Sequence, residues 1–156
     1  MRDSETITAA PLGLTIEWHK DKIVHIELHY DDLPPEKYST AEAYALRKAL
    51  IAYVEGKLDQ WPDLPFDFSI VPPFQTKALK QLCKVKPGTT VTYGELASMC
   101  GKPKGARAVG RAMATNPFPL VYPCHRVVGA NDDLVGFGGG INLKKYLLDH
   151  EGALES

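Results

Sequence analysis

The first third of the chain alternates apolar and polar residues, as a β-hairpin does. In "LTIEWHKDKIVHIELHY" (residues 14–30) the alternation runs on both sides of "HKDK", a tetrapeptide typical of a turn. Every second side chain should then face a core. The apolar residues that we expect to supply one or both buried faces are Ile16, Trp18, Ile23, Ile26 and Leu28.

A helix is predicted next, in "STAEAYALRKALIAYVEGK" (residues 39–57), because the apolar spacing changes to three or four residues. Ser39 or Thr40 can cap its start, and Glu42 lies three residues after Ser39, as in a capping box. Gly56 can end the helix. Its apolar stripe is expected to comprise Tyr44, Leu46, Leu50, Ile51 and Val54.

A domain boundary is predicted in "WPDLPFDFSIVPPF" (residues 61–74), which is rich in proline and aromatic residues and reads as a connection with one short strand. Residues 1–71 would form an N-terminal domain and residues 72–156 a second domain. A chain of 156 residues is long enough for both.

A helix with a basic surface is predicted in "PFQTKALKQLCKVKPG" (residues 73–88). Cys83 lies beside its apolar stripe, and we interpret this cysteine as a packing residue rather than a reactive one. The residues of the stripe are Phe74, Ala78, Leu79, Leu82 and Val85.

Two shorter helices should follow, "TYGELASMCG" (residues 92–101) and "ARAVGRAMATN" (residues 106–116), joined by the turn "KPKG". The first should end at Gly101. Two short helices joined by a tight turn form a candidate helix-turn-helix motif. The side chains of the first helix that should face inward are Leu96, Ala97 and Cys100.

The second helix of this pair carries two arginines, Arg107 and Arg111, among small residues, whereas a core helix would contain more leucine and isoleucine. Small side chains let a helix lie close to a phosphate-lined groove, and arginine supplies phosphate contacts or an inserted side chain. We therefore interpret this helix as a DNA-contacting one. Its small residues are Ala108, Gly110, Ala112 and Ala114.

The distribution of charge agrees with a nucleic-acid partner. Residues 1–74 carry seven Lys/Arg against thirteen Asp/Glu (net −6), and residues 127–156 carry two against five (net −3). Residues 75–126 carry nine against one (net +8), inside a chain whose net charge is −1. Such a block is typical of a surface that binds a polyanion, although a solvated lysine face would have the same composition.

The composition, 44% hydrophobic and 24% charged, is that of a folded globular protein. No apolar run approaches the ~20 residues needed to span a bilayer, and residues 1–20 lack a signal-peptide core. We therefore expect a cytoplasmic protein, or a nuclear one in a eukaryote, with no membrane partner.

Neither a metal site nor a disulfide is expected. The three cysteines form no CxxC pair, and their spacing of 17 and then 24 residues matches no compact zinc motif. An odd count in a reducing compartment argues against disulfides. The histidines of the predicted hairpin have no carboxylate cluster beside them; they are His19, His25 and His29.

The stretch "NPFPLVYPCHRVVG" (residues 116–129) places a thiol, Cys124, on a proline-rich corner directly before His125 and Arg126. Basic neighbours favour the thiolate, the nucleophilic form of cysteine. A catalytic base must in turn be oriented by a third group, and Glu151, at the end of a predicted helix, could be buried against His125. The downstream carboxylates that could orient the base are Asp132, Asp133, Asp149, Glu151 and Glu155.

The motif "PCHRVVG" (residues 123–129) closely resembles the active-site motif of the O6-alkylguanine-DNA alkyltransferases, or methylated-DNA–protein-cysteine methyltransferases. The resemblance extends over roughly residues 73–153, about half of the chain, and "GFGGGINLKKYLLDHEG" (residues 136–152) resembles the family's closing loop and last helix. It implies an α+β fold: a ribonuclease-H-like α/β N-terminal domain, then a mostly helical domain with a helix-turn-helix (winged-helix-like) DNA-binding motif.

The resemblance also implies roles for individual residues. Cys124 would take the alkyl group from O6 of a damaged guanine by in-line attack. His125 would be its water-mediated general base, and Glu151 would orient His125. Tyr93 would donate a proton toward the leaving guanine. Asn116 would bind backbone groups and fix the turn before Cys124.

The implied partner is double-stranded DNA containing O6-alkylguanine, bound through its minor groove by a monomer. The damaged nucleotide must leave the duplex before its alkyl carbon can be reached, and Arg107 would fill the vacated space. Whether O4-alkylthymine is also accepted is left open. The other residues implied to contact DNA are Thr92, Tyr93, Ala108, Gly110 and Arg111.

The substrate pocket is implied to contain Tyr93, Val127, Phe137 and Gly138. Phe137 stands where the family often has tyrosine, and Gly138 where it has serine or alanine, so the range of alkyl groups stays open. The thioether formed at Cys124 would have no easy exit, so each molecule would act once, without a metal or organic cofactor. Arg126 is expected to be structural, pairing with a carboxylate or with carbonyls.

Three other functions are open. An alkyltransferase-like protein would bind alkylated DNA without reaction, but such proteins replace the reactive cysteine, usually with tryptophan. A helix-turn-helix regulator could hold Cys124 as an inert thiol, although it has no use for Tyr93, Asn116, His125 and Glu151 together. A purely structural or protein-interaction domain does not account for the basic block.

Overall fold

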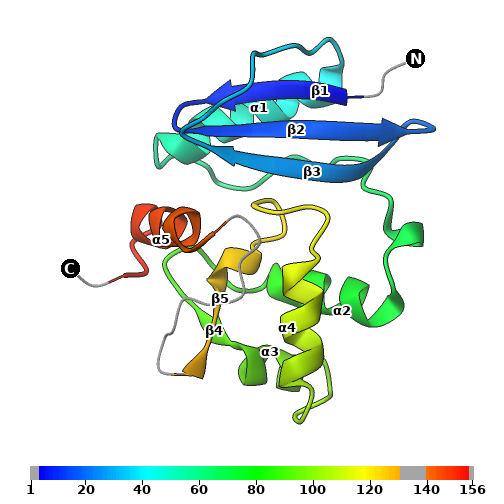
Figure 1. Ribbon diagram of the computed structural model, residues 1–156, viewed down its shortest axis with the longest axis vertical. Helices are drawn as coiled ribbons and strands as arrows, with labels where there is room; N and C mark the ends of the chain where they lie inside the picture. The colour runs from blue at the N-terminus through cyan, green and yellow to red at the C-terminus, as the bar shows by residue number, and fades with distance from the viewer. Residues whose placement is uncertain (1–3, 131–139, 155–156) are drawn as a thin grey trace. The chain divides into compact units, whose positions relative to one another are not determined.

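The computed structural model describes residues 4–130 and 140–154, which form two compact units, one ending at Ile70 and the other beginning at Val71 (Figure 1). The first unit combines a three-stranded antiparallel sheet with one long helix, and the second is mostly helical with a two-stranded parallel sheet. The fold is therefore a mixed α/β one. Among the described residues, no helix is long and apolar enough to cross a membrane.

The strands of the first unit lie in the order β1-β2-β3, with bounds Ser4–Ala9, Leu12–His19 and Lys22–Tyr30. The predicted hairpin is confirmed as β2 and β3, which pair antiparallel with Ile16 opposite Ile26. The two turn residues, Lys20 and Asp21, have φ values of 50° and 65°. Positive φ at both positions matches the turn to the twist of the strands.

Strand β1 was not predicted, and it carries a buried glutamate at an inward position. Glu5 Oε2 accepts hydrogen bonds from the backbone N–H groups of Ser39 (2.6 Å) and Thr40 (2.9 Å). Its Oε1 accepts from the Thr40 hydroxyl (2.7 Å) and from the Trp18 indole N–H (2.8 Å). One carboxylate thus joins β1, β2 and the start of the helix. Because a charged residue occupies an inward position, the sequence of β1 does not show the alternation that would predict a strand.

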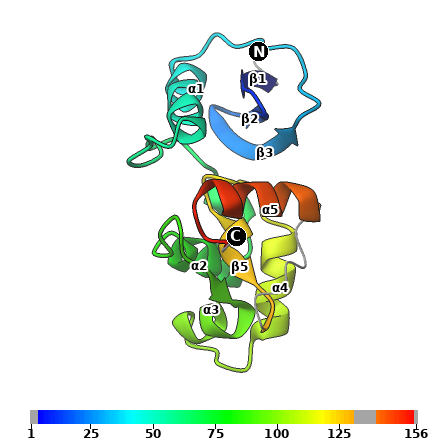
Figure 2. The ribbon, with the colours of Figure 1, turned by 90° about the vertical axis from the view of Figure 1, so that its left-hand side faces the viewer.

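The helix of this unit, α1 (Ala41–Val54), lies along one face of the sheet (Figure 2). Thr40 is its N-cap and accepts a hydrogen bond from the backbone N–H of Ala43 at 3.0 Å. The predicted capping box between Ser39 and Glu42 is wrong. The carboxylate that bonds the backbone N–H of the N-cap comes from Glu5 on the neighbouring strand instead of from the third helical residue.

Two further predictions for this unit are wrong. Tyr44 is 55% exposed, so the buried face of α1 is rotated from the predicted stripe. The connection to the second unit holds no short strand among the described residues: Phe66 forms a single bridge with Ile23, and a 3-10 helix, η1 (Phe68–Ile70), follows. Prolines in this segment cannot donate to a strand ladder. The buried residues of α1 are Ala43, Leu46, Ala49, Leu50 and Tyr53.

The second unit contains α2 (Pro73–Leu82), β4 (Val91–Thr92), α3 (Tyr93–Met99), α4 (Ala106–Ala114), β5 (Val127–Val128) and α5 (Ile141–His150). Helices α2, α3 and α4 pack against one another, and the β4–β5 pair lies between α5 and the pair α3 and α4 (Figure 1). Most of the stripe predicted for α2 is buried, but Phe74 is only partly so. Cys83 is exposed, so its interpretation as a packing residue is wrong.

The two predicted short helices are confirmed as α3 and α4. Thr92 and Glu95 form a capping box at the start of α3, and Gly101, with φ of 78°, follows its end. The three residues predicted to face inward from α3 and its C-cap, Leu96, Ala97 and Cys100, are buried.

Replacing Glu5 by glutamine is expected to lower the free energy of unfolding of the first unit by about 2–3 kcal/mol, because the new amide N–H groups would face groups that are themselves donors. Both tryptophans of the chain, Trp18 and Trp61, lie in this unit. Urea unfolding followed by tryptophan fluorescence therefore measures the loss. Glu27→Gln, at an exposed position of β3, is the matched control. Equal midpoints for the two variants would contradict the role given to Glu5.

Candidate active site

Cys124 opens a 3-10 helix, η2 (Cys124–Arg126), that continues directly into β5. The residue is 5% exposed, and its backbone N–H donates to the carbonyl of Tyr122 at 2.8 Å. The pKa of the thiol is raised, because the effect of burial outweighs a hydrogen bond from Asn116 and the positive charge of Lys144, which both act to lower it. The ionisation of this thiol therefore depends on a few identified neighbours.

Asn116 holds the turn that precedes Cys124. Its Nδ2 donates to the carbonyl of Tyr122 at 2.9 Å, and its Oδ1 accepts from the backbone N–H of Phe118 at 2.9 Å. Phe118 is fully buried and fixes the middle of the turn. One amide side chain thus joins both ends of the segment that leads to the thiol.

His125 is fully buried, and its Nε2 lies 2.7 Å from Oε2 of Glu151. Burial lowers the pKa of His125 below 6.5 in spite of the opposing effect of the carboxylate, so the ring is neutral near pH 7. A neutral ring bonded to a carboxylate through Nε2 carries its proton on that nitrogen. Nδ1 is then the basic atom, and it is buried without a hydrogen-bond partner among the described residues. His125 can accept a proton there.

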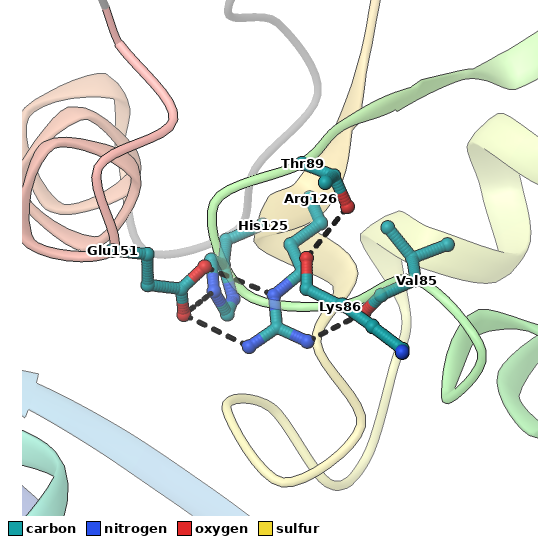
Figure 3. A network of polar contacts seen from close by, with 6 residues as sticks. All are labelled: Val85, Lys86, Thr89, His125, Arg126 and Glu151. Atoms are coloured by element: carbon teal, nitrogen blue, oxygen red, sulfur yellow. Dashed lines mark hydrogen bonds and ion pairs between the residues drawn. The ribbon is translucent and has the colours of Figure 1, made fainter. Parts of the chain in front are cut away.

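Glu151, the C-cap of α5, is the acceptor that the site shares (Figure 3). Its side chain is 2% exposed, and Arg126 donates to it from Nε (2.9 Å to Oε1) and from Nη2 (3.0 Å to Oε2). Burial acts to raise the pKa of Glu151, but the hydrogen bonds from His125 and Arg126 outweigh it and lower the pKa to about 2. The carboxylate is ionised at neutral pH and fixes both side chains.

Arg126 also connects the site to the loop after α2, because its Nη1 donates to the carbonyl of Val85 at 2.7 Å (Figure 3). It pairs with both a carboxylate and a carbonyl. Since its guanidinium is held by Glu151, it is Lys144 that has the largest charge effect on the pKa of Cys124. The sequence analysis expected His125 and Arg126 to favour the thiolate through their charge. Both side chains instead bind the Glu151 carboxylate, so this expectation is incomplete.

The loop that supplies the Val85 carbonyl is closely fitted. Thr89 Oγ1 donates to the carbonyl of Lys86 at 2.6 Å (Figure 3). Gly88 has φ of 86°, and a β-carbon at this position would lie 3.1 Å from the backbone carbonyl oxygen of Glu151. Glycine is required for its backbone conformation and for this approach to the end of α5.

Tyr93 and Cys124 flank the short β4–β5 ladder. Thr92 pairs with Val128, so Tyr93 follows the first strand and Cys124 precedes the second. Burial and the negative charge of the Cys124 thiolate both raise the pKa of Tyr93. The phenol therefore keeps its proton at neutral pH and can donate it.

The outer face of α4 carries the two arginines one turn apart. Arg107 and Arg111 are exposed, and Ala108 and Gly110 are partly so. A β-carbon at position 110 would meet no atom within 4 Å among the described residues, so the fold does not require glycine there. Ala112, which the sequence analysis counted among the small residues of the DNA-contacting helix, is buried and does not belong to this outer face.

Of the four residues expected in a substrate pocket, Phe137 and Gly138 lie outside the described residues. Val127 is fully buried, and its carbonyl accepts a hydrogen bond from Lys144. Within the part of the chain that the structure describes, no three His, Cys, Asp or Glu residues are grouped to bind a metal ion.

Comparison with known proteins identifies the family. Residues 73–153 match the family model of the 6-O-methylguanine DNA methyltransferase DNA-binding domain. The methylated-DNA–protein-cysteine methyltransferase of Shigella flexneri is 37% identical over 89% of this chain and 82% of its own. This chain belongs to the methylated-DNA–protein-cysteine methyltransferase family. The methyltransferase of Mycobacterium bovis is also 37% identical, over 91% of this chain and 88% of its own.

Solved structures of this methyltransferase family share the fold of both units. The crystal structure of Mycobacterium tuberculosis OGT in complex with DNA has a TM-score of 0.76 and 33% identity, and covers 96% of this chain and 92% of that one. The O6-methylguanine-DNA methyltransferase of Pyrococcus kodakaraensis has a TM-score of 0.72 and 28% identity, with 96% and 98% covered.

Lys144 is the residue near the methyltransferase site that sequence reasoning missed. A signal was present, because in "INLKKYLLDH" this lysine lies three and four residues before Leu147 and Leu148, within the apolar stripe of the helix. Gly88 and the Val85 carbonyl were missed as well, and no pattern marks a backbone carbonyl as a ligand of a distant arginine.

Acid is expected to destabilise the second unit in a pH window set by Glu151. The pKa of this carboxyl is about 2 in the folded protein, against an ordinary 4.5. Its contribution, about 3 kcal/mol for a shift of this size, is fully present above pH 4.5 and is lost as the pH falls through 2. His125 acts in the same direction, because its pKa is lowered from 6.5 and the unfolded chain binds the proton more readily below that value.

Urea unfolding at a series of pH values, followed by far-ultraviolet circular dichroism, measures this window. The difference between wild type and Glu151→Gln should shrink as the pH falls from 4.5 toward 2. Asp149→Asn, two residues earlier and exposed, should show no such trend. A difference between wild type and Glu151→Gln that is constant over this range would refute the assignment.

Proposed function

We propose that this chain repairs alkylated DNA by moving the alkyl group from O6-alkylguanine in a duplex to Cys124, once per molecule. The observation that carries the proposal is the buried Glu151–His125 pair directly after the thiol, with Nδ1 of His125 left as the basic atom. Family membership supports the same chemistry, because the relatives are named methylated-DNA–protein-cysteine methyltransferases.

The transfer begins with removal of the thiol proton. A water molecule would carry it from Sγ of Cys124 to Nδ1 of His125, and Glu151 would stabilise the resulting imidazolium through Nε2. The thiolate then attacks the alkyl carbon in line with the bond to O6. A sulfur–carbon bond forms, the carbon–oxygen bond breaks, and its electron pair stays on the guanine.

Tyr93 would supply the proton that the departing guanine needs. Its raised pKa keeps the phenol protonated at neutral pH, and protonation makes the guanine a better leaving group. The reaction balances without a cofactor, because the nucleophile, base and acid are all side chains. The product thioether at Cys124 is uncharged and stable, so the protein is consumed.

DNA would be bound in the minor groove by the helix-turn-helix formed by α3 and α4. Arg107 and Arg111 are exposed on α4 and can contact the phosphate backbone of the DNA, while the small residues Ala108 and Gly110 allow the helix to approach the groove closely. The alkylated nucleotide must be extruded, since its alkyl carbon is otherwise stacked inside the duplex. Arg107 would then occupy the vacated space.

The finer description of the fold belongs to the same proposal. Residues 72–156 would be the DNA-binding and catalytic domain, with a winged-helix-like motif, and residues 1–71 a ribonuclease-H-like domain. The protein would act as a monomer. Thr92 and Tyr93, at the start of α3, would contact the DNA beside the extruded base, and Val127, Phe137 and Gly138 would line the pocket with Tyr93.

Intact-mass spectrometry after incubation with duplex DNA containing O6-methylguanine should show one added methyl group per protein, located on Cys124 by peptide mapping. Undamaged duplex is the control substrate, and Cys100, the other buried thiol, should stay unmodified. A protein that binds the damaged duplex but stays unmodified would instead be an alkyltransferase-like binder. Cys124→Ser should retain binding and lose transfer.

Replacing Arg107 by alanine should slow transfer from duplex DNA at least about tenfold, because extrusion of a stacked base costs a few kcal/mol that the inserted side chain offsets. Transfer from free O6-benzylguanine, which needs no extrusion, should change little. Lys104→Ala, exposed in the turn before α4, controls for loss of a positive charge. Equal losses on the two substrates would rule out the insertion role.

A further inference from the structure

Helix α2 and the turn that follows it carry three exposed lysines, Lys77, Lys80 and Lys84, which we call the α2 lysine row. Their spacing of three and four residues places them on one side of the helix. The turn continues the helix, because the backbone N–H of Lys84 donates to the carbonyl of Gln81 at 3.0 Å. The opposite side of α2 is the one that packs into the second unit, through Ala78, Leu79 and Leu82.

The row is a surface of one sign. Like charges at this spacing destabilise a helix, and a surface that is charged for solubility normally mixes both signs. Between residues 68 and 131 the only Asp or Glu is Glu95. Its carboxylate accepts a hydrogen bond from the backbone N–H of Thr92 at 2.8 Å, within the capping box of α3. A polyanion is therefore the partner whose charge complements the row.

The row begins beside the turn that joins α3 to α4. A β-carbon at Gly101, in that turn, would lie 4.0 Å from Nζ of Lys77. Burial raises the pKa of Cys100, the C-cap of α3, and the charge of Lys77 acts against this effect. From the same turn, Nζ of Lys102 lies 5.2 Å from the centre of the Phe74 ring, in the first turn of α2. The basic surface thus continues from the helix-turn-helix onto α2.

The dimensions of DNA bring the row within the reach of a duplex that α4 holds. Helix α4 has nine residues and is about 14 Å long, whereas one turn of duplex is about 34 Å long. A duplex in contact with α4 therefore extends past the helix. The turn beside which the row begins adjoins the N-terminal end of α4, and α2 packs against both α3 and α4 (Figure 1).

We propose that Lys77, Lys80 and Lys84 contact the phosphate backbone of the duplex next to the segment held by α4, and form a second, sequence-independent part of the DNA interface. The proposal rests on the function proposed above and extends its DNA contacts to a helix outside the α3–α4 pair. Seven residues of helix span about 10 Å, which matches about three phosphates of one strand at 3.4 Å each. Such contacts hold and orient the protein without reading bases.

The test replaces all three lysines by glutamine, which keeps a flexible polar side chain without the charge. Binding to an undamaged duplex is measured by fluorescence anisotropy at a series of salt concentrations. Each phosphate contact contributes about 0.9 to the slope of log K against log salt, so the slope should fall by about 2–3, and binding in about 0.1 M salt should weaken about tenfold or more. The variant with arginine at all three positions should bind as wild type does.

A matched control removes the same charge from the first unit. Lys20, Lys22 and Lys57 are exposed there, and their joint replacement by glutamine should leave the salt slope unchanged. An equal fall in the two triple variants would show an effect of net charge alone and would overturn the proposal.

A measurement on the wild-type protein needs no variant to fold. Lysine acetylation mapped by mass spectrometry should show that duplex DNA protects Lys77, Lys80 and Lys84 and leaves Lys57 reactive. Equal acetylation of the row with and without DNA would contradict the proposed contact.

A second copy of this chain is the other anionic partner to be distinguished, because residues 1–74 carry a net charge of −6. Binding is therefore measured on a duplex so short that titration gives one protein per duplex. Weaker binding of the glutamine variant to this duplex supports a contact with DNA. A loss confined to longer duplexes that hold several proteins would assign the row to contacts between copies and would overturn the proposal.

The binding measurements use undamaged DNA, so they separate this proposal from the proposed function. A protein that takes no methyl group from O6-methylguanine duplex would refute the proposed function, whatever the salt slopes show. A protein that takes the methyl group, and whose DNA binding is indifferent to the three lysines, would refute the second contact alone. In a functional protein, the glutamine variant should need about tenfold more duplex to reach its half-maximal transfer rate.

Discussion

The Glu151 carboxylate is the group on which the site depends. It lies at the end of α5 and accepts hydrogen bonds from two consecutive residues of η2, while the second of these, Arg126, reaches the loop after α2. Three segments that are distant in sequence are thus joined through the Glu151 carboxylate and the Arg126 guanidinium. Because both donors are buried, loss of this acceptor would leave a guanidinium and an imidazole unsatisfied together, and a buried charge without its partner is strongly destabilising.

The two units use buried carboxylates in different ways. In the first unit, Glu5 accepts from two backbone N–H groups, a hydroxyl and an indole, all neutral, and its pKa is lowered by these hydrogen bonds against the effect of burial. It stabilises a helix start. In the second unit, Glu151 accepts from the Arg126 guanidinium and from the His125 imidazole. The hydrogen bond from His125 to this carboxylate fixes the tautomer of the ring. The same side chain fixes backbone in one case and chemistry in the other.

The sequence predicts the elements that follow a regular period. Alternation, helical spacing and short motifs are local properties of a sequence. They are enough to predict the hairpin, the three helices of residues 73–116 and the position of the thiol beside a histidine. The motif also led to the correct family. Strand β1 was not predicted, because its inward-facing Glu5 acts across 35 residues of sequence and takes the place of the carboxylate of a local capping box. Lys144 was missed for a related reason. A lysine at an apolar position of a helix is normally taken to lie at the edge of the buried face, and only the structure shows that its side chain is buried.

The two-residue parallel ladder of β4 and β5 has a consequence for how this site can vary. Tyr93 follows one strand and Cys124 lies three residues before the other, so main-chain hydrogen bonds, which are the same for any side chains, join the two segments that carry the proposed acid and nucleophile. Substitutions in the surrounding helices can change how DNA is held without breaking this connection. Divergence among such proteins in the size of alkyl group accepted would then come from side chains around the ladder, while the ladder keeps the two segments together.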